Sequence, residues 1–356
     1  MKDEKRYTAL NYITNEFLDF INSKGYMIEQ PVNITSKIDP SVRFIGAPIS
    51  ILKPYFLNKN IPDTGIAMKQ NCIRTQNQKI LYEPSILPNW GSFFTGMCIL
   101  VRYTDLCRIC LDAIELLTKY FKIDINDINI NINKKDGDLL NAIKMTALGH
   151  NQILFNKKPD KYYTHKYGIE GVSGRNFNFS IRNCRTGEFN DIGNIIIIES
   201  SSGEKLGVEL ALGDTTIIKQ KYGLNHVLDA YCLGLDFIKN SNIRYRIEDA
   251  IITAIVLLNE GLKPNGGETR GRILKSYIKS ISLYSYLIGI KDDVLFNVIK
   301  TTEAEKLPII CHDVASELMS YISKYRNSML ANPVGKENEK ISSLLKNDLY
   351  KLPEIL

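Results

Sequence analysis

The stretch that decides the fold runs from Ile66 to Tyr103 and reads IAMKQNCIRTQNQKILYEPSILPNWGSFFTGMCILVRY. Its first apolar run ends at Arg74, a polar, turn-rich segment follows, and a second apolar run extends from Phe93 to Val101. Two apolar runs separated by turn residues predict a long antiparallel hairpin. Arg74 falls where the first strand meets its loop, so its forked guanidinium could reach a phosphate or a carboxylate along the sheet face. An edge arginine in an ordinary hairpin is the alternative, and the hairpin alone favours it.

The composition is that of a globular protein of the cytosol. The 356 residues are 44% hydrophobic and 24% charged, enough for a large core and for two domains. A net charge of +6 permits a polyanionic partner without requiring one. No apolar run is long enough to span a membrane, and the N-terminal MKDEKRY lacks the apolar core of a signal peptide. Seven scattered cysteines suit a reducing compartment, so we expect a cytoplasmic protein without membrane association.

Cysteines and histidines are not spaced as metal ligands. Cys107 and Cys110 form a single CxxC, which a zinc or redox site could use. The surrounding LCRICLDAIELL has helical spacing, which favours two buried cysteines on a helix. The histidines are far apart in the sequence: His150, His165, His226 and His312. We therefore expect no structural metal.

Periodicity predicts the elements around the hairpin. Apolar residues recur with helical spacing from Tyr7 to Ile21. The next segment, residues 31–58, is expected to be rich in β-structure with breaks at its prolines. Residues 105–121 have the apolar spacing of a helix, and INDININI at residues 125–132 predicts a short strand.

The second half of the chain changes from strands to helices. Four consecutive isoleucines within Asp191 to Glu199 predict a strand buried on both faces. A strand through Gly213 precedes a helix for which Asp214 could serve as the N-cap. Residues 245–290 read as two helices joined by a turn that contains proline, asparagine and glycine. The chain beyond them is expected to be helical, with breaks at Pro308, Pro333 and Gly335.

The order of these elements resembles that of the alanyl-tRNA synthetases, which are class II aminoacyl-tRNA synthetases. The segments FLDFINSKGY, IDPSVRFIGAPISILKPYFL and QNCIRT follow one another as the first two class II motifs do in that family. The most specific match is RIEDAIITAIVLLNEGLKPNGGETRGRILKSYIKS, which parallels two family helices and their connecting turn. The resemblance covers almost the whole chain and corresponds to the N-terminal half or less of a complete enzyme. Nothing after Ile290 resembles an editing domain or a C-terminal dimerisation region.

The resemblance implies an α+β fold in two parts. Residues 1–240 would form a class II synthetase-like catalytic domain, a mostly antiparallel sheet flanked by helices. Residues 241–356 would form an all-helical domain like the one that recognises tRNA. Binding partners implied by the family are a small amino acid and the acceptor stem of a tRNA.

The resemblance also assigns residues to an amino-acid pocket. Asn194 takes the position of an asparagine that lines the pocket, although a hydrogen-bonded core asparagine is the alternative. Glu209 falls on the aspartate that grips the ammonium group of the substrate, alanine or an analogue. Gly171 and Gly174 fall on a GxxG turn beside the pocket, unless they are ordinary turn residues.

The nucleotide implied by the family is ATP with Mg²⁺. Arg74 corresponds to the arginine of the second motif, which holds the α-phosphate, and Phe94, Met97 and Gly213 fall in the nucleotide site. The third motif departs from the family pattern GLER, because this chain reads GDTT and ends on Thr216. A threonine cannot replace a guanidinium at a γ-phosphate. The histidines and the glutamate of the family's hairpin loop are also missing.

The turn and second helix of the helical part correspond to a tRNA-binding surface. Asn265 is the nearest counterpart of an asparagine that reads the minor groove of the acceptor stem. The basic residues on this surface are Arg270, Arg272, Lys275 and Lys279. Such a row faces phosphates in the family, whereas a solvated helix face is the alternative.

Three hypotheses follow from the resemblance. The chain is a shortened ligase that activates a small amino acid, with Lys69, Arg175 or Arg182 in place of the missing arginine. Alternatively, it is a paralogue with an impaired ATP site that uses aminoacyl-tRNA in a specialised pathway. The third hypothesis is a non-catalytic tRNA-binding or regulatory module. The amino acid and the acceptor molecule stay open.

Overall fold

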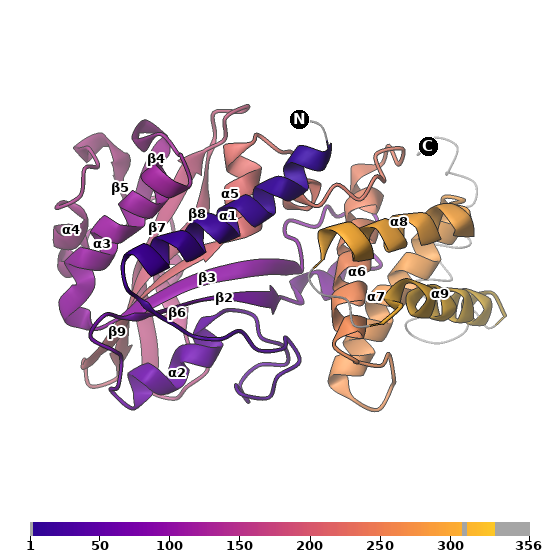
Figure 1. Ribbon diagram of the computed structural model, residues 1–356, viewed down its shortest axis with the longest axis horizontal. Helices are drawn as coiled ribbons and strands as arrows, with labels where there is room; N and C mark the ends of the chain where they lie inside the picture. Colours follow the sequence, from indigo (N-terminus) through magenta and orange to yellow (C-terminus); the bar gives the residue numbers. More distant parts are fainter. Residues whose placement is uncertain (1–2, 308–311, 332–356) are drawn as a thin grey trace. The chain divides into compact units, whose positions relative to one another are not determined.

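A mixed sheet flanked by helices, followed by a group of helices, makes up the fold (Figure 1). The computed structural model describes residues 3–307 and 312–331. Within them the chain forms two compact units: residues 3–72 with 94–230, and residues 73–93 with 231–331. The predicted α+β class is confirmed. The predicted division into residues 1–240 and 241–356 stays a prediction, and the hairpin loop at 73–93 groups with the helices.

The sheet orders its strands β1-β2-β3-β9-β8-β7-β4-β5, with β6 beside β7. The pairings β3–β9, β9–β8, β8–β7 and β7–β4 are antiparallel, whereas β1–β2 and β4–β5 are parallel. The predicted hairpin therefore forms the neighbouring strands β2 and β3. The strands are β1 (Met27–Ile28), β2 (Ile66–Ile73), β3 (Phe93–Val101), β4 (Ile128–Ile132), β5 (Ile153–Phe155), β6 (Thr164–Lys166), β7 (Val172–Arg182), β8 (Phe189–Ser200) and β9 (Lys205–Gly213).

The core of the sheet unit is built from long runs of β-branched and aromatic residues. Ile195, Ile196, Ile197 and Ile198 of β8 are all buried, which confirms the predicted strand with two covered faces. Helices of this unit are α1 (Asp3–Ser23), α2 (Ile49–Leu57), α3 (Leu106–Glu115), α4 (Gly137–Ile143) and α5 (Asp214–Lys221). A single π-helical turn, Leu116–Tyr120, continues α3. Short 3₁₀ turns lie at Tyr103–Asp105, Ile125–Asp127, His150–Gln152, Asp160–Tyr163 and Val227–Ala230.

The prediction of β-structure over residues 31–58 is wrong. Ile49–Leu57 form the helix α2, and no regular strand lies between residues 31 and 48. The segment ISILKPYFL is apolar over most of its circumference, so its periodicity does not separate a buried helix from a strand. Tertiary packing decides for the helix, because α2 buries Leu52 and Phe56 against the sheet.

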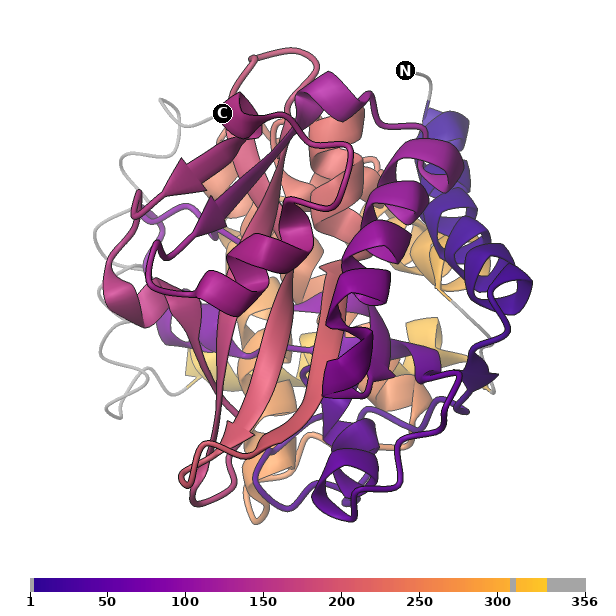
Figure 2. The same cartoon turned by 90° about the vertical axis from the view of Figure 1, so that its left-hand side faces the viewer.

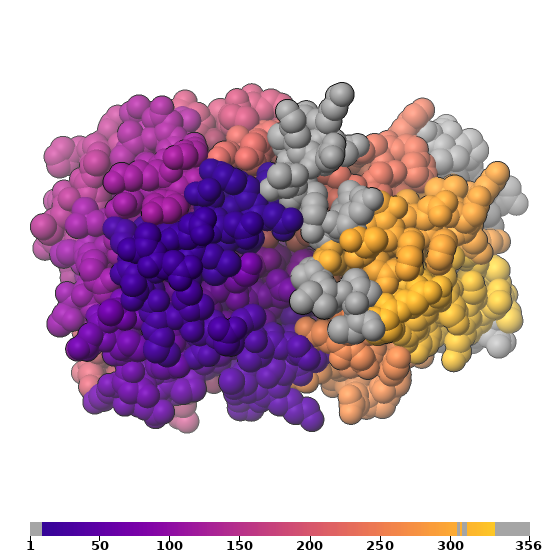
Figure 3. Space-filling view, viewed as in Figure 1, coloured from indigo at the N-terminus to yellow at the C-terminus, as the bar shows by residue number. Residues whose placement is uncertain are grey.

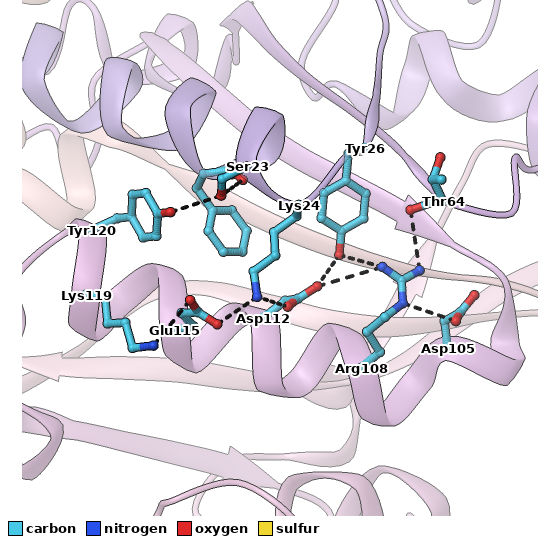
Figure 4. A network of polar contacts seen from close by, with 11 residues as sticks. Ser23, Lys24, Tyr26, Thr64, Asp105, Arg108, Asp112, Glu115, Lys119 and Tyr120 are labelled. Atoms are coloured by element: carbon cyan, nitrogen blue, oxygen red, sulfur yellow. Dashed lines mark hydrogen bonds and ion pairs between the residues drawn. The ribbon is translucent and has the colours of Figure 1, made fainter.

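A polar network joins the end of α1 to α3 (Figure 4). Lys24, just after α1, lies 3.0 Å from Asp112 and 2.7 Å from Glu115. The hydroxyl of Tyr26 donates to Asp112, and Arg108 donates to that hydroxyl at 3.1 Å. Burial and the Asp112 carboxylate raise the pKa of Tyr26. These contacts hold α1 beside α3 (Figure 2), and α1 forms part of the outer surface in Figure 3.

The helical unit contains α6 (Ser241–Asn259), α7 (Thr269–Leu287), α8 (Asp292–Lys306) and α9 (Val314–Ala331), as predicted for the second half of the chain. α6 contacts α7, α8 and α9, and nearly all of its side chains are buried. Residues 73–93 complete the unit, with a 3₁₀ turn at Gln76–Ile80. The expected breaks at Pro308, Pro333 and Gly335 lie outside the described residues.

Cysteine exposure differs in part from the prediction. Cys110 is buried in α3, but Cys107 is exposed on the same helix, so the expectation of two buried cysteines is wrong for Cys107. In residues 3–307 and 312–331, every helix is too short or too polar to cross a lipid bilayer. The same residues include no cluster of three or more acidic, cysteine or histidine side chains suited to a metal ion.

We expect Gly193→Ala to lower the free energy of unfolding by about 2–3 kcal/mol. An added Cβ at this position of β8 would lie 2.2 Å from the backbone oxygen of Ala211 on β9, and a paired strand cannot move aside cheaply. Urea denaturation measures the change. Gly137→Ala is the control, because its Cβ would enter open space, and it should cause no loss. Equal stabilities of the two variants would contradict the described register of β8 and β9.

Candidate functional site

Most residues predicted to bind the amino acid share one face of the sheet. Paired residues project to the same face, and the face alternates along each strand. Glu209 of β9 pairs with Ile196 of β8, and Asn194 lies two residues before Ile196. Gly174 of β7 pairs with Ile198, so it projects to that face as well. We call it the α2 face, because α2 packs on it, and it carries Phe94, Gly174, Asn194, Glu209 and Gly213.

The α2 face is buried at one end and accessible at the other. Apolar side chains of α2 cover one end, and Glu209 is only 2% exposed. Phe94, Asn194, Ala211 and Gly213 are half-buried. The sheet therefore combines a deep carboxylate with a shallower surface of small and polar side chains. A face with a buried carboxylate at one end and accessible small residues at the other suits a small ligand that carries a positive group at one end.

Glu209 accepts hydrogen bonds from two neutral donors. The hydroxyl of Tyr167 donates to Oε2 at 3.0 Å, and Sγ of Cys98 donates to Oε1 at 3.8 Å. Burial raises the pKa of both donors well above their usual values, and the carboxylate adds to the shift. Tyr167 and Cys98 therefore keep their protons and orient the carboxylate. A buried carboxylate favours an added cation such as an ammonium group.

Asn194 is oriented by two side chains on the same face. Its Nδ2 donates to Oδ1 of Asn178 at 3.2 Å and lies 3.2 Å from Nε2 of His165. The amide is therefore held in place by hydrogen bonds at a half-buried position. This geometry is compatible with both predicted roles, a pocket residue and a hydrogen-bonded core asparagine.

The two glycines of the predicted GxxG turn lie at different places. Gly171 precedes β7, and its oxygen accepts from the backbone of Ser201 at 2.7 Å. Gly174 is within β7, where an added Cβ would come 2.5 Å from Cγ2 of Ile196. Packing against β8 therefore accounts for glycine at position 174.

Several other predicted residues project away from the α2 face. Met97 is fully buried and pairs with Leu212, on the opposite face from Gly213. Lys69 alternates with Met68, which packs in the α2-face core, so Lys69 also projects to the opposite face. Burial lowers the pKa of Lys69. The structure does not bring Met97 and Lys69 together with the pocket residues.

Arg175 and Arg182 are engaged by carboxylates. Arg175 is ion-paired with Asp136 at 2.8 Å, with Glu199 at 2.5 Å and with Asp138. Those partners raise its pKa, with Asp138 contributing most. The guanidinium of Arg182 pairs with Asp127 at 2.9 Å. Arg175 therefore has three competitors for any phosphate, which counts against its use as the missing third-motif arginine.

Arg74 is the first residue after β2, as predicted. Its side chain is exposed, and its backbone N–H donates to the oxygen of Ser92 at 2.9 Å. That bond closes the base of the hairpin loop. Arg74 belongs to the helical unit by its contacts.

The third-motif segment forms the start of α5. Gly213 is the N-cap and Asp214 is the first helical residue, so the predicted N-cap is wrong by one position. The hydroxyl of Thr216 donates to the oxygen of Gly213 at 2.9 Å. Oδ1 of Asp214 accepts from the backbone of Thr95 at 3.0 Å and of Thr215 at 2.6 Å. Burial nevertheless raises the pKa of Asp214 to about 7.

The predicted tRNA-binding residues lie on α7 and on the turn before it. Arg272 is exposed, while Arg270, Lys275 and Lys279 are half-buried. Spacings of three and four residues place Arg272, Lys275 and Lys279 on one side of the helix. The ammonium of Lys275 lies 5.5 Å from the ring centre of Tyr325. The side chain of Asn265 accepts from the backbone of Glu268 at 3.2 Å and so shapes the turn.

Sequence reasoning missed four polar residues of the α2 face. They are Cys98, Tyr167, Asn176 and Asn178. The alternation in NFNF at residues 176–179 was an available signal, because it places both asparagines on one face. Asn176 is fully buried, and neither of its side-chain polar atoms has a partner among the described residues. Buried polar groups without a hydrogen-bond partner are uncommon in folded proteins.

Comparisons with known proteins identify relatives of one kind. Alanine–tRNA ligase of Thermoanaerobacter sp. (strain X514) is 22% identical over 331 residues, which are 82% of this chain and 37% of that protein. Alanine–tRNA ligase of Mycoplasma mobile is 24% identical over 384 residues, 94% of this chain and 42% of that protein. This chain thus spans about two fifths of the length of these relatives. No protein-family model matches the chain.

Solved structures with a similar arrangement are also synthetases. Apo S. aureus histidyl-tRNA synthetase has a TM-score of 0.37 and 8% identity, covering 62% of this chain and 72% of that chain. Aspartyl-tRNA synthetase from Entamoeba histolytica has a TM-score of 0.38 and 11% identity, covering 63% of this chain and 57% of that chain.

The mixed, largely antiparallel sheet with flanking helices is an α+β fold. Over most of its length the chain is similar to alanine–tRNA ligases, which confirms the predicted resemblance to the alanyl-tRNA synthetases.

Asp214 should make stability fall as pH rises from about 4 to about 7. In that range the folded state holds a proton that the unfolded carboxyl, with a pKa near 3.9, has released. The free energy of unfolding of the wild type should therefore decrease between pH 5 and pH 8, and we expect Asp214→Asn to remove up to about 3 kcal/mol of that decrease. Urea denaturation at a series of pH values tests this, with the exposed Asp19→Asn as control. If the free energy of unfolding of the wild type and of Asp214→Asn changes with pH in parallel, the hydrogen bonds from Thr95 and Thr215 lower the pKa of Asp214 as much as burial raises it.

Proposed function

We propose that the chain activates a small amino acid, alanine or an analogue, with ATP and transfers it to tRNA or to another acceptor. The observation that carries the proposal is the buried carboxylate of Glu209, which shares the α2 face with Asn194 and Gly213. The similarity to alanine–tRNA ligases supports the same proposal. We place the activity in the cytoplasm, where the six free cysteines in the described residues would stay reduced.

Each residue has a separate role in the proposed activation. Glu209 binds the ammonium group of the amino acid, and Tyr167 and Cys98 hold the carboxylate in place. Asn194 orients the substrate through its amide. Small residues at positions 211 and 213 are half-buried on the α2 face, where a compact substrate would bind.

ATP is the co-substrate of the proposed reaction. An oxygen of the amino-acid carboxylate attacks the α-phosphorus, an acyl–phosphate bond forms, and pyrophosphate leaves with the electrons of the broken P–O bond. Arg74 supplies positive charge to the α-phosphate, where negative charge develops in the transition state. Magnesium would neutralise the remaining phosphate oxygens, as it does in phosphoryl transfer generally.

A paralogue that uses aminoacyl-tRNA is the second candidate. It is favoured by the third motif, where Thr216 donates to Gly213 and provides no charge for a γ-phosphate. The three carboxylates around Arg175 favour it as well. Such a protein would keep the pocket and the surface of α7 but would not activate the amino acid. A non-catalytic tRNA-binding module would keep only the surface of α7.

Pyrophosphate exchange with ATP, measured over a panel of small amino acids, tests activation. We expect Arg74→Ala to lower kcat by about 10²–10³-fold, the usual effect of losing one group that stabilises transition-state charge. Glu209→Gln should raise KM for the amino acid far more than KM for ATP. The control is Arg185→Ala, an exposed arginine outside the site. If the wild type exchanges with no amino acid, activation is wrong and the paralogue becomes the better proposal.

Filter binding of a tRNA pool at several salt concentrations tests the surface of α7. Changing Lys275 and Lys279 together to Ala should weaken binding about 10-fold at low salt and reduce the slope of log affinity against log salt by about two. A matched control changes Lys291, the N-cap of α8, and Lys300, within α8, to Ala. An unchanged slope in the α7 variant would show that these lysines are solvated side chains only.

A further inference from the structure

The hairpin loop after Arg74 is built against α6 and α7 of its own unit. The 75–92 loop places the oxygens of Ile80, Glu83 and Ile86 around the guanidinium of Arg246 on α6. Nη2 of Arg246 donates to the oxygen of Glu83 at 2.7 Å and to the oxygen of Ile86 at 2.6 Å. The side chain of Arg246 is only 1% exposed. An arginine buried with three carbonyl partners fixes the course of a loop that has little regular structure of its own.

Asp249, one turn further along α6, holds the end of the same loop. One carboxylate oxygen accepts from the backbone N–H of Ser92 at 2.5 Å. The other accepts from the Ser92 hydroxyl at 2.7 Å and from Nδ2 of Asn77 at 2.9 Å. Tyr277 of α7 adds a hydrogen bond with the Ser92 hydroxyl at 2.8 Å. Asn77 also donates to the oxygen of Trp90 at 2.6 Å, so both ends of the loop meet at Asp249.

Ser92 links this cluster to Arg74. Its backbone N–H is held by Asp249, and its backbone oxygen accepts from the N–H of Arg74. Asp249 is 2% exposed, and burial of a carboxylate is costly unless its acceptor capacity is used. Here three donors use it, all from the loop. The backbone at position 74 is therefore fixed by side chains that lie about 170 residues away in the sequence.

We propose that Asp249 and Arg246 are positioning residues for Arg74. They hold the 75–92 loop on α6. Arg74, whose guanidinium binds ATP in the proposed reaction, therefore belongs to the same unit as the basic side of α7. This inference rests on the proposed function for the role of Arg74, but the attachment of the loop to α6 does not.

Asp249→Asn in the full chain is the test. The substitution keeps volume but turns one acceptor into an N–H donor that faces the donors of Ser92 or Asn77. We expect backbone amides of residues 75–92 to exchange hydrogen at least 10-fold faster. KM for ATP should rise, or kcat fall, about 10-fold, while KM for the amino acid stays within two-fold. The control is Asp293→Asn, an exposed carboxylate on α8, which should change none of these quantities.

Tyr277→Phe is the second variant, in case Asp249→Asn fails to fold. It removes only the hydroxyl that meets Ser92 and should produce smaller changes in the same direction. Faster amide exchange with unchanged ATP kinetics would overturn the positioning role and leave the proposed function intact.

Equilibrium binding of ATP separates the remaining outcomes. A wild type that binds ATP without pyrophosphate exchange would overturn the proposed function. The positioning role would then stand if Asp249→Asn weakens ATP binding as Arg74→Ala does. A wild type that binds no ATP would overturn both.

Discussion

The register of β9 between β3 and β8 is the constraint on which the candidate site depends. A shift of one residue along a strand exchanges its two faces. Glu209 would then project to the side of Leu210 and Leu212, and an apolar side chain would face Tyr167. The register is enforced by close backbone approach at Gly193 and by the four isoleucines of β8, which fill both sides of the strand. The arrangement of polar residues in the candidate site is therefore a consequence of how the core packs.

The elements that the sequence predicted best are those with strong local signals. Both hairpin strands, the isoleucine strand and the helices after residue 240 have clear periodicity and clear breaks. α2 was missed because a nine-residue, nearly all-apolar segment has no periodic signal, and its helical state depends on packing against the sheet. Cys107 was misjudged for a similar reason, since the spacing of a helix does not show which side another element covers.

The candidate site was predictable only in part. The resemblance alone suggests Asn194 and Glu209, and strand pairing places both on the same face of the sheet. The roles of Tyr167 and Cys98 could not be predicted from the sequence, because their hydrogen bonds to Glu209 join three segments that are far apart in the chain. The ion partners of Arg175 were hidden in the same way. They explain why a basic residue near a motif in sequence is a poor substitute for a lost arginine: its charge is already compensated.

Arg74 and Thr216, the two positions that the resemblance compares with phosphate-binding arginines, have different surroundings in this chain. At position 216 the threonine hydroxyl donates to the oxygen of Gly213, at the start of its own helix. At the second motif a buried carboxylate and a buried arginine still hold the loop that follows Arg74. Buried charges of this kind are costly to keep, and breaking such a cluster leaves an uncompensated group in the core. The Asp249 cluster therefore has two physical effects: it stabilises the helical unit, and through Ser92 it fixes the backbone at Arg74.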